Sequence, residues 1–283
     1  MPAHGGRSAS FAWLAAFSMY TVVVISRIQA NQREVQPPTA RLLRNSYGVA
    51  RHDGIACQNS SITYSDVTFY VVSSVDTYQT RVPPLLNTWI GEVERRGATV
   101  RVFVGPGDQN FSHPNVVRVP RDLGRVNCSA NPPEHCDAMF REHTAWLAAN
   151  AATLLVCHVD DDSVIHVDRF LAALRCLPHP AAELWMLGLC RKVPWEKHAF
   201  CTGGASFTYP ARLLPGMARC HAGAGRADDV QASWCAMVGG ATLVHHPFFF
   251  YGTMRRRGWV TAHHVRPEQV PIFYRDPTIR KAA

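Results

Sequence analysis

The chain has 283 residues, a formal net charge of +8 and a sequence pI of about 9.2, and 47% of its residues are hydrophobic. This length and apolar content suffice for one large domain or two small ones with a buried core. The positive charge is mostly scattered arginine, and the one dense run, Arg255–Arg257, lacks the aromatic pattern of a nucleic-acid platform. We therefore expect no nucleic-acid partner, because basicity alone bears on solubility and non-specific attraction.

The N-terminal segment from Ser8 to Ser26 contains no charged residue and is strongly apolar. Its length is at the short end of what spans a bilayer, where about 17–25 residues are needed. A cleaved signal peptide is the alternative, but its apolar region is usually about 7–15 residues, and no clear small-x-small cleavage site follows. We predict a short cytoplasmic tail at 1–8, an uncleaved signal anchor at 9–26 and a polar stem at 27–65.

Nine cysteines and three glycosylation sequons, at Asn59, Asn110 and Asn127, favour the secretory pathway, where disulfides persist. A short apolar span also suits the thinner bilayers of the early secretory pathway. We therefore expect a single-pass type II protein of the Golgi or endoplasmic reticulum membrane, with its folded domain in the lumen.

Beyond the stem, β-branched and aromatic runs alternate with segments of helical spacing. We expect strands at 67–73, 99–104, 116–119 and 153–157, and helices at 83–96 and 137–150. Such alternation indicates an α/β domain with a largely parallel sheet, in which ligands bind beyond the carboxyl ends of the strands. The triplet Asp160–Asp162 follows the strand at 153–157 and falls at that edge.

Three adjacent aspartates after an apolar strand are electrostatically awkward, because like charges raise one another's pKa unless positive charge is near. One interpretation is a solvated turn or a helix N-cap close to Ser163. The other is a site for a hard cation, Mn²⁺ or Mg²⁺, which accepts carboxylate oxygens and ties a diphosphate to the protein. The position directly after the strand favours the cation site for Asp160–Asp162.

Two further clusters carry possible chemistry. The small-residue turn Thr202–Ala205 contains Gly203 and Gly204, which let the backbone approach a ligand closely, although a plain turn has the same composition. The pair Asp228-Asp229 precedes a helical stretch, and it is either an acidic helix N-terminus or a general base that takes a proton from an attacking hydroxyl.

In this order and spacing the three clusters resemble the Fringe-like family of inverting β-1,3-glycosyltransferases. The string Cys157–Asp162 is nearly the family's own, Thr202–Ala205 matches its glycine turn, and Asp228-Asp229 matches its acidic pair. The similarity extends from about 67 to 251, so we interpret 66–252 as a Fringe-like glycosyltransferase domain and 253–283 as a C-terminal extension.

The resemblance implies a GT-A fold, which is a nucleotide-sugar-binding α/β domain with a largely parallel, twisted sheet flanked by helices. It implies that Asp162, together with Asp160, binds the metal, and that Asp229 or Asp228 is the catalytic base, with Asp229 favoured. The residues that it assigns to the nucleotide sugar are Arg81, Asp160, Asp161, Gly203 and Gly204.

Several positions depart from the family pattern. The family carries a metal-binding histidine in a Phe-His-Ser string near the end of the domain, and the similarity places Phe250 there. His245-His246 lie a few residues earlier and can substitute only if the strand register differs; we interpret them as ordinary histidines. Cys220 and Cys235 flank the acidic pair and can form a bridge, whereas the partner of Cys157 stays open.

The implied activity is inverting transfer of a GlcNAc- or Gal-type sugar from a UDP-sugar to a hydroxyl of a glycan or glycoprotein, with a β-1,3 linkage. The alternative is a catalytically inactive, lectin-like or scaffolding relative, which the missing metal-binding histidine suggests. A metal-dependent phosphohydrolase is less favoured, because the sequence supplies no motif for a second metal or for an aspartate nucleophile.

Overall fold

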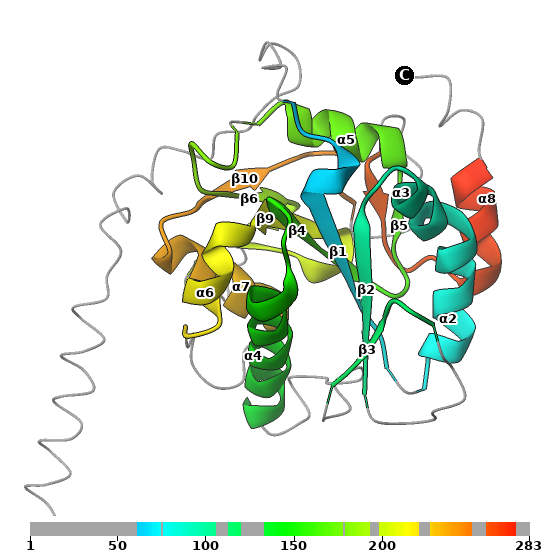
Figure 1. Cartoon of the computed structure of the whole chain (residues 1–283), viewed down its shortest axis with the longest axis horizontal. Helices are drawn as coiled ribbons and strands as arrows, with labels where there is room; N and C mark the ends of the chain where they lie inside the picture. The colour runs from blue at the N-terminus through cyan, green and yellow to red at the C-terminus, as the bar shows by residue number, and fades with distance from the viewer. Residues whose placement is uncertain are drawn as a thin grey trace, which may run out of the picture. The chain divides into compact units, whose positions relative to one another are not determined.

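The computed structural model describes residues 61–74, 76–105, 113–119, 133–177, 179–192, 198–220, 227–250 and 259–275. Their centre is a seven-stranded sheet in the order β10-β6-β9-β4-β1-β2-β3 (Figure 1). Every pairing in it is parallel except those of β9, which runs antiparallel to β4 and β6. The predicted α/β class with a largely parallel sheet is therefore confirmed. The strands are β1 Val67–Val72, β2 Thr99–Val104, β3 Val116–Arg118, β4 Leu155–Asp160, β6 Trp185–Gly188, β9 Phe207–Pro210 and β10 Thr242–His245.

Two small antiparallel sheets complete the strands, β5 (Val164–Ile165) with β11 (Thr261–Ala262) and β7 (Cys190–Arg191) with β8 (Phe200–Cys201). The helices are α2 Tyr78–Leu85, α3 Gly91–Arg95, α4 Pro133–Asn150, α5 Val167–Arg175, α6 Leu214–Met217, α7 Asp228–Val238 and α8 Val270–Arg275. The short 3₁₀ turns are η1 Tyr64–Asp66, η3 Gly203–Ala205, η4 Ala211–Leu213 and η5 Pro267–Gln269, and a π-helical turn, η2, covers Leu86–Ile90.

The central strand β1 is buried on both faces because helices cover both sides of the sheet (Figure 1). Phe69 points to one side, where its ring packs against Phe170 of α5 and Trp89 of η2. Tyr70 points to the other side, where it meets the ring of His143 in α4. This alternation follows from the two-residue period of a strand. It explains why β1 is a continuous hydrophobic and aromatic run, as strands buried on both faces are.

The parallel pairing of β1 with β4 positions the aspartates. Val72, the last residue of β1, lies opposite Asp160, the last residue of β4. The two chains therefore leave the sheet together, and Asp160–Asp162 lie beside Ser73 and Ser74. This is the carboxyl edge at which an α/β sheet binds ligands.

The helical segment after β1 differs from the prediction. The sequence predicts a helix that Pro83 and Pro84 open, but α2 begins at Tyr78 and contains both prolines near its C-terminal end. A proline inside a helix cannot donate its backbone hydrogen bond, and the helix is disturbed nearby. Here α2 passes into the π-helical turn η2, where the Thr88 hydroxyl donates to the Pro84 carbonyl at 2.7 Å.

Several predictions made from the sequence concern other parts of the chain. The tail at 1–8, the anchor at 9–26, nearly all of the stem at 27–65 and the three sequon asparagines lie outside the described residues. No helix among the residues that the structure describes is long and apolar enough to cross a membrane. Within the predicted C-terminal extension, 253–283, β11 pairs with β5, and Val270 and Phe273 of α8 belong to the same hydrophobic core as β1.

Trp89 links the helical segment to the loop after β4, since its indole Nε1 donates to the Ser163 carbonyl at 3.2 Å and its ring is fully buried. We predict that Trp89→Ala lowers the free energy of unfolding by about 3–5 kcal/mol, because it leaves a large cavity beside Phe69. Urea denaturation measures this change. Ile272→Ala, at a side chain that is 55% exposed, is the control and is expected to cost less than about 0.5 kcal/mol. Equal losses in the two variants would contradict this role of Trp89.

Candidate functional site

Asp161 is the most completely bound of the three adjacent carboxylates. Its Oδ2 accepts hydrogen bonds from the hydroxyls of Ser73 and Thr77, both at 2.7 Å, and its Oδ1 accepts from Arg81 at 2.8 Å. The same guanidinium nitrogen lies 3.3 Å from Oδ2 of Asp162. Asp161 thus fixes the chain after β1 and the direction of Arg81. Both of its oxygens already have protein donors, so this geometry gives Asp161 a positioning role more readily than a direct contact with a ligand.

Asp160 lies between two histidines. Its Oδ1 is 2.8 Å from Nε2 of His158, and its Oδ2 is 3.4 Å from Nε2 of His263. Burial opposes ionisation, but the two imidazoles outweigh it and hold the pKa of Asp160 below its ordinary value. The His158 ring is itself buried, stacked on Phe207 at 4.6 Å and edge-on to Tyr70 at 5.0 Å. Asp160 is therefore an ionised carboxylate in a fixed orientation.

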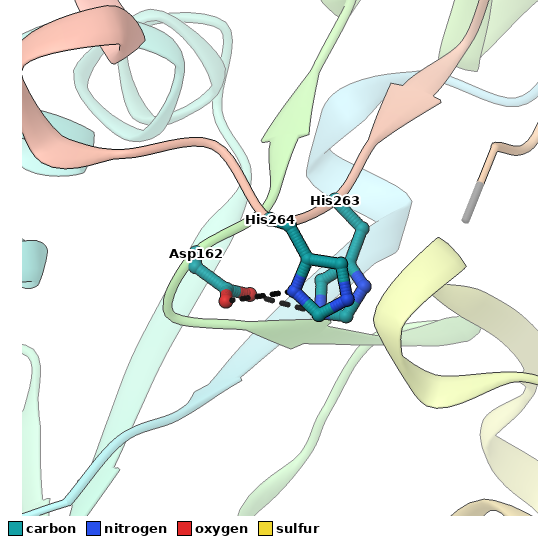
Figure 2. A group of neighbouring side chains, drawn as sticks. All are labelled: Asp162, His263 and His264. Carbon is teal, nitrogen blue, oxygen red and sulfur yellow. Dashed lines mark ion pairs between the residues drawn. The ribbon is translucent and has the colours of Figure 1, made fainter. Parts of the chain in front are cut away.

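Asp162 faces two histidines that follow β11 (Figure 2). Nε2 of His263 lies 2.9 Å from Oδ1 of Asp162, and Nδ1 of His264 lies 3.6 Å from Oδ2. Burial lowers the basicity of His263, but Asp160 and Asp162 outweigh it and raise the pKa of His263 to about 9. The sequence similarity left open which residue stands in for the family's metal-binding histidine, and the structure places His263 next to Asp162.

The similarity placed Phe250 where a histidine was expected. Phe250 instead packs partly buried against the core, and its amide donates to the Thr261 carbonyl at 3.2 Å. His246 directly follows edge strand β10, where its amide donates to the Gly188 carbonyl at 2.9 Å and its ring packs against Phe249. The sequence signal that could have pointed to this pair is the adjacency of His263 and His264 shortly after the β-branched residues Val260-Thr261.

Gly204 makes room for His263. A Cβ atom on Gly204 would lie 2.2 Å from Cε1 of the His263 ring, a separation that no side chain tolerates. The carbonyl of Gly204 also accepts a hydrogen bond from the Ser163 hydroxyl at 3.1 Å, which ties the glycine turn to the loop after β4. A glycine is needed here so that the imidazole can reach Asp160 and Asp162.

Gly203 connects the turn to the acidic pair at the start of α7. Its amide donates to Oδ2 of Asp229 at 3.0 Å, and a Cβ on Gly203 would lie 3.3 Å from Nε2 of His158. Oδ1 of Asp229 accepts from the Val230 amide at 2.7 Å, and the Asp229 amide donates to Asp228 at 2.9 Å. Burial and the Asp228 carboxylate raise the pKa of Asp229 to about 7. Asp229 is thus poised to exchange a proton near neutral pH.

One disulfide and one hydroxyl hold α7 to its neighbours, and a second disulfide braces the strand before the glycine turn. The Cys220–Cys235 bridge suggested by the sequence is present, and a second bridge joins Cys190 to Cys201, just before the glycine turn. The Ser233 hydroxyl accepts from the Cys201 amide at 2.9 Å. Cys157 is a buried free thiol and has no disulfide partner among the described residues. These bonds fix the distance between the glycine turn and Asp229.

The residues around Asp162 fit a divalent cation. Among the described residues, the only close polar neighbour of its buried Oδ1 is Nε2 of His263, at 2.9 Å and without good hydrogen-bond geometry. Asp162, His263 and His264 offer ligand atoms that all lie within 4.8 Å of one another. Carboxylate and imidazole together suit a first-row transition ion such as Mn²⁺. The donor set and the space that Gly204 leaves for His263 therefore agree with the predicted metal site.

Comparison with known families shows to which family this chain belongs. The model of the Fringe-like family matches residues 62–235, which is more than half of the chain. The chain belongs to the Fringe-like family. This membership implies a glycosyltransferase with a UDP-sugar donor and a glycan acceptor, and it agrees with the GT-A-like arrangement of the sheet. The match ends at Cys235, before His263 and His264. No curated protein matches the chain when the sequences are compared.

The contact between Gly204 and His263 gives a direct test of the cation site. We predict that Gly204→Ala lowers Mn²⁺ affinity by at least about tenfold, because the new methyl group displaces the imidazole; changes around metal ligands cost about 10–100-fold. Electron paramagnetic resonance of free Mn²⁺ measures the loss. Gly216→Ala is the matched control, since a Cβ there meets nothing within 4 Å. Wild-type affinity in Gly204→Ala would show that His263 does not hold the cation.

Proposed function

We propose that this Fringe-like protein transfers a sugar, of the GlcNAc or Gal type, from a UDP-sugar to a hydroxyl of a glycan or glycoprotein, with inversion and a β-1,3 linkage. The observation that carries the proposal is the position of Gly203. Its amide binds Asp229, and its Cα faces His158, which holds Asp160. The candidate base and the carboxylates at the end of β4 therefore belong to one site.

On this proposal, Asp162 and His263 hold the cation, with Asp160 beside them. A bound divalent cation supplies positive charge that stabilises a departing diphosphate. The guanidinium of Arg81, 35% exposed and directed by Asp161 and Asp162, offers a second positive group to the nucleotide. Gly203 and Gly204 present backbone without side chains, so a donor can approach this edge closely.

Asp229 is the proposed general base. Its pKa of about 7 makes it a stronger base than an ordinary aspartate, while about half of it is ionised at neutral pH. The acceptor hydroxyl gives its proton to Asp229 and attacks the anomeric carbon from the face opposite the diphosphate. An α-linked donor then gives a β-linked product. Asp228, next to it, helps to raise the pKa of Asp229.

The inactive, lectin-like alternative rested on the missing metal-binding histidine. His263 beside Asp162 removes that reason, and the raised pKa of Asp229 favours a catalytic role over a binding one. We further propose that the protein acts in the lumen of the Golgi or endoplasmic reticulum, anchored as a type II protein by 9–26. The apolar N-terminal segment, the nine cysteines and the two disulfides among the described residues support this location.

A screen of UDP-sugars with glycan acceptors, followed by UDP release, tests the function. We predict that Asp229→Asn abolishes transfer but keeps UDP and Mn²⁺ binding, because the amide cannot accept the hydroxyl proton. The base must be deprotonated to act, so kcat/KM of the wild type should rise with pH and level off above about pH 7. Below that pH the rate should fall about tenfold per unit.

Asp168→Asn, on α5, is the control for this experiment, since Asp168 pairs with Arg96 away from the glycine turn and the acidic pair. It should leave the transfer rate and its pH profile unchanged. Full activity in Asp229→Asn would refute the proposed base. Binding of cation and UDP without transfer from any donor would favour the lectin-like alternative.

A further inference from the structure

We propose that His264 is a second imidazole ligand of the cation at Asp162, so that this chain builds a site of two histidines and one carboxylate. The inference rests on the cation site of the proposed function. It goes beyond it by adding His264 as a ligand, which strengthens the preference of the site for a first-row transition ion over Mg²⁺. The ligand atoms of Asp162, His263 and His264 lie within 4.8 Å of one another.

Both imidazoles lie close to the Asp162 carboxylate, one beside each oxygen. His263 Nε2 is 2.9 Å from Oδ1, and His264 Nδ1 is 3.6 Å from Oδ2 (Figure 2). Ligands on adjacent positions of one ion, each at about 2.1 Å from it, stand about 3 Å apart. These spacings are therefore close to those of ligands that share a cation. Asp162 and His263 are largely buried, with side-chain exposures of 16% and 7%, whereas His264 is 54% exposed and forms the solvent-facing side of the group.

The backbone explains how two neighbouring residues come to face one carboxylate. Successive side chains of a strand point to opposite faces, so an extended continuation of β11 would direct His264 away from His263. His264 instead has φ of +58°, in the left-handed region, and the two rings lie 3.8 Å apart at 31°. Few residues other than glycine adopt this conformation, although histidine is among those enriched there.

The histidine pair is anchored on the aspartate that it faces. The amide of Val265, the next residue, donates to the backbone carbonyl of Asp162 at 2.9 Å. Chain positions 162 and 265 are thus fixed to each other, and the turn at His264 is held between this bond and β11. The surrounding structure therefore holds His264 in its unfavourable conformation next to the proposed metal ligands. Backbone strain of this kind clusters at functional sites.

Two imidazoles change which cation the site prefers. Mg²⁺ favours an all-oxygen shell and gives up its waters reluctantly. Imidazole suits first-row transition ions, whose affinity for nitrogen ligands rises from Mn²⁺ towards Cu²⁺. A site with His263 alone would discriminate less than one with both histidines. His264 should therefore contribute to transition-ion affinity and little to Mg²⁺ affinity.

Cation titrations of the full chain without nucleotide test the inference. Wild type, His264→Gly, His264→Asn, His263→Ala and Asp162→Ala are titrated with Co²⁺, with Mn²⁺ and with Mg²⁺. Glycine and asparagine both tolerate positive φ, so these variants keep the turn. We expect His264→Gly and His264→Asn to lose at least about tenfold in Co²⁺ affinity, as for disturbed metal sites generally. Their Mg²⁺ affinity should change less than about twofold.

A spectroscopic count of ligands gives an independent readout. Pulsed electron paramagnetic resonance of bound Cu²⁺ should show both imidazoles of this group in wild type and one in His264→Gly. His245→Asn, on edge strand β10, is the matched control and should behave as wild type in both measurements. Loss of nitrogen coupling and Co²⁺ affinity in both His264 variants, with His245→Asn unchanged, supports the inference.

The outcomes separate this inference from the proposed function. Unchanged Co²⁺ affinity and nitrogen coupling in both His264 variants, with loss in His263→Ala and Asp162→Ala, would overturn the role of His264 and leave the cation site intact. An effect of His264→Gly on UDP binding alone would also overturn it, since His264 would then contact the nucleotide. Failure of the wild type to bind any cation would overturn both.

Discussion

Three consecutive carboxylates at the end of a buried strand must be neutralised, and much of this site follows from that requirement. Like charges so close cannot all stay ionised without positive groups nearby. A different set of neighbouring groups compensates the charge of each aspartate in the triplet. Asp161 receives Arg81 and two hydroxyls, Asp160 lies between His158 and His263, and Asp162 faces the two histidines after β11. The groups that neutralise the triplet come from α2, from β4 itself and from the segment after β11.

This division gives the three aspartates different capacities. Asp161 is used by the protein, so it orders the loop after β1 and directs Arg81. Asp160 contacts His158, whose ring is stacked on Phe207. The packing of side chains on the sheet therefore fixes the orientation of Asp160. Asp162 keeps a buried oxygen that has only His263, at 2.9 Å and without good hydrogen-bond geometry, as its partner among the described residues. A divalent cation and a diphosphate would together complete the charge balance at Asp162. The electrostatic need of the fold and the proposed chemistry thus concern the same carboxylate.

Much of this could be predicted from the sequence, and the failures have physical causes. The aromatic and β-branched runs predicted β1, β2 and β4, because a strand buried on both faces reads as a nearly continuous hydrophobic run. The order of those strands then placed Asp160 and Asp162 at the ligand-binding edge. His263 could not be found by similarity along the chain, since Phe249 bridges Thr261 and the two segments lie side by side. Aligning the family's histidine by position along the chain therefore falls on Phe250, which lies in the segment before the one that carries His263. The positive φ of His264 and the hydrogen bonds to Asp161 are likewise tertiary facts, which no local pattern records.

The central claim is that the cation and the nucleotide bind as one unit at the end of β4. Calorimetric titration of UDP into the full chain, first with Mn²⁺ and then with a chelator, tests it most directly. The account predicts UDP binding that weakens by at least about tenfold, or about 1.4 kcal/mol, when the cation is removed. Equal UDP affinity with and without Mn²⁺, or no UDP binding in its presence, would contradict it.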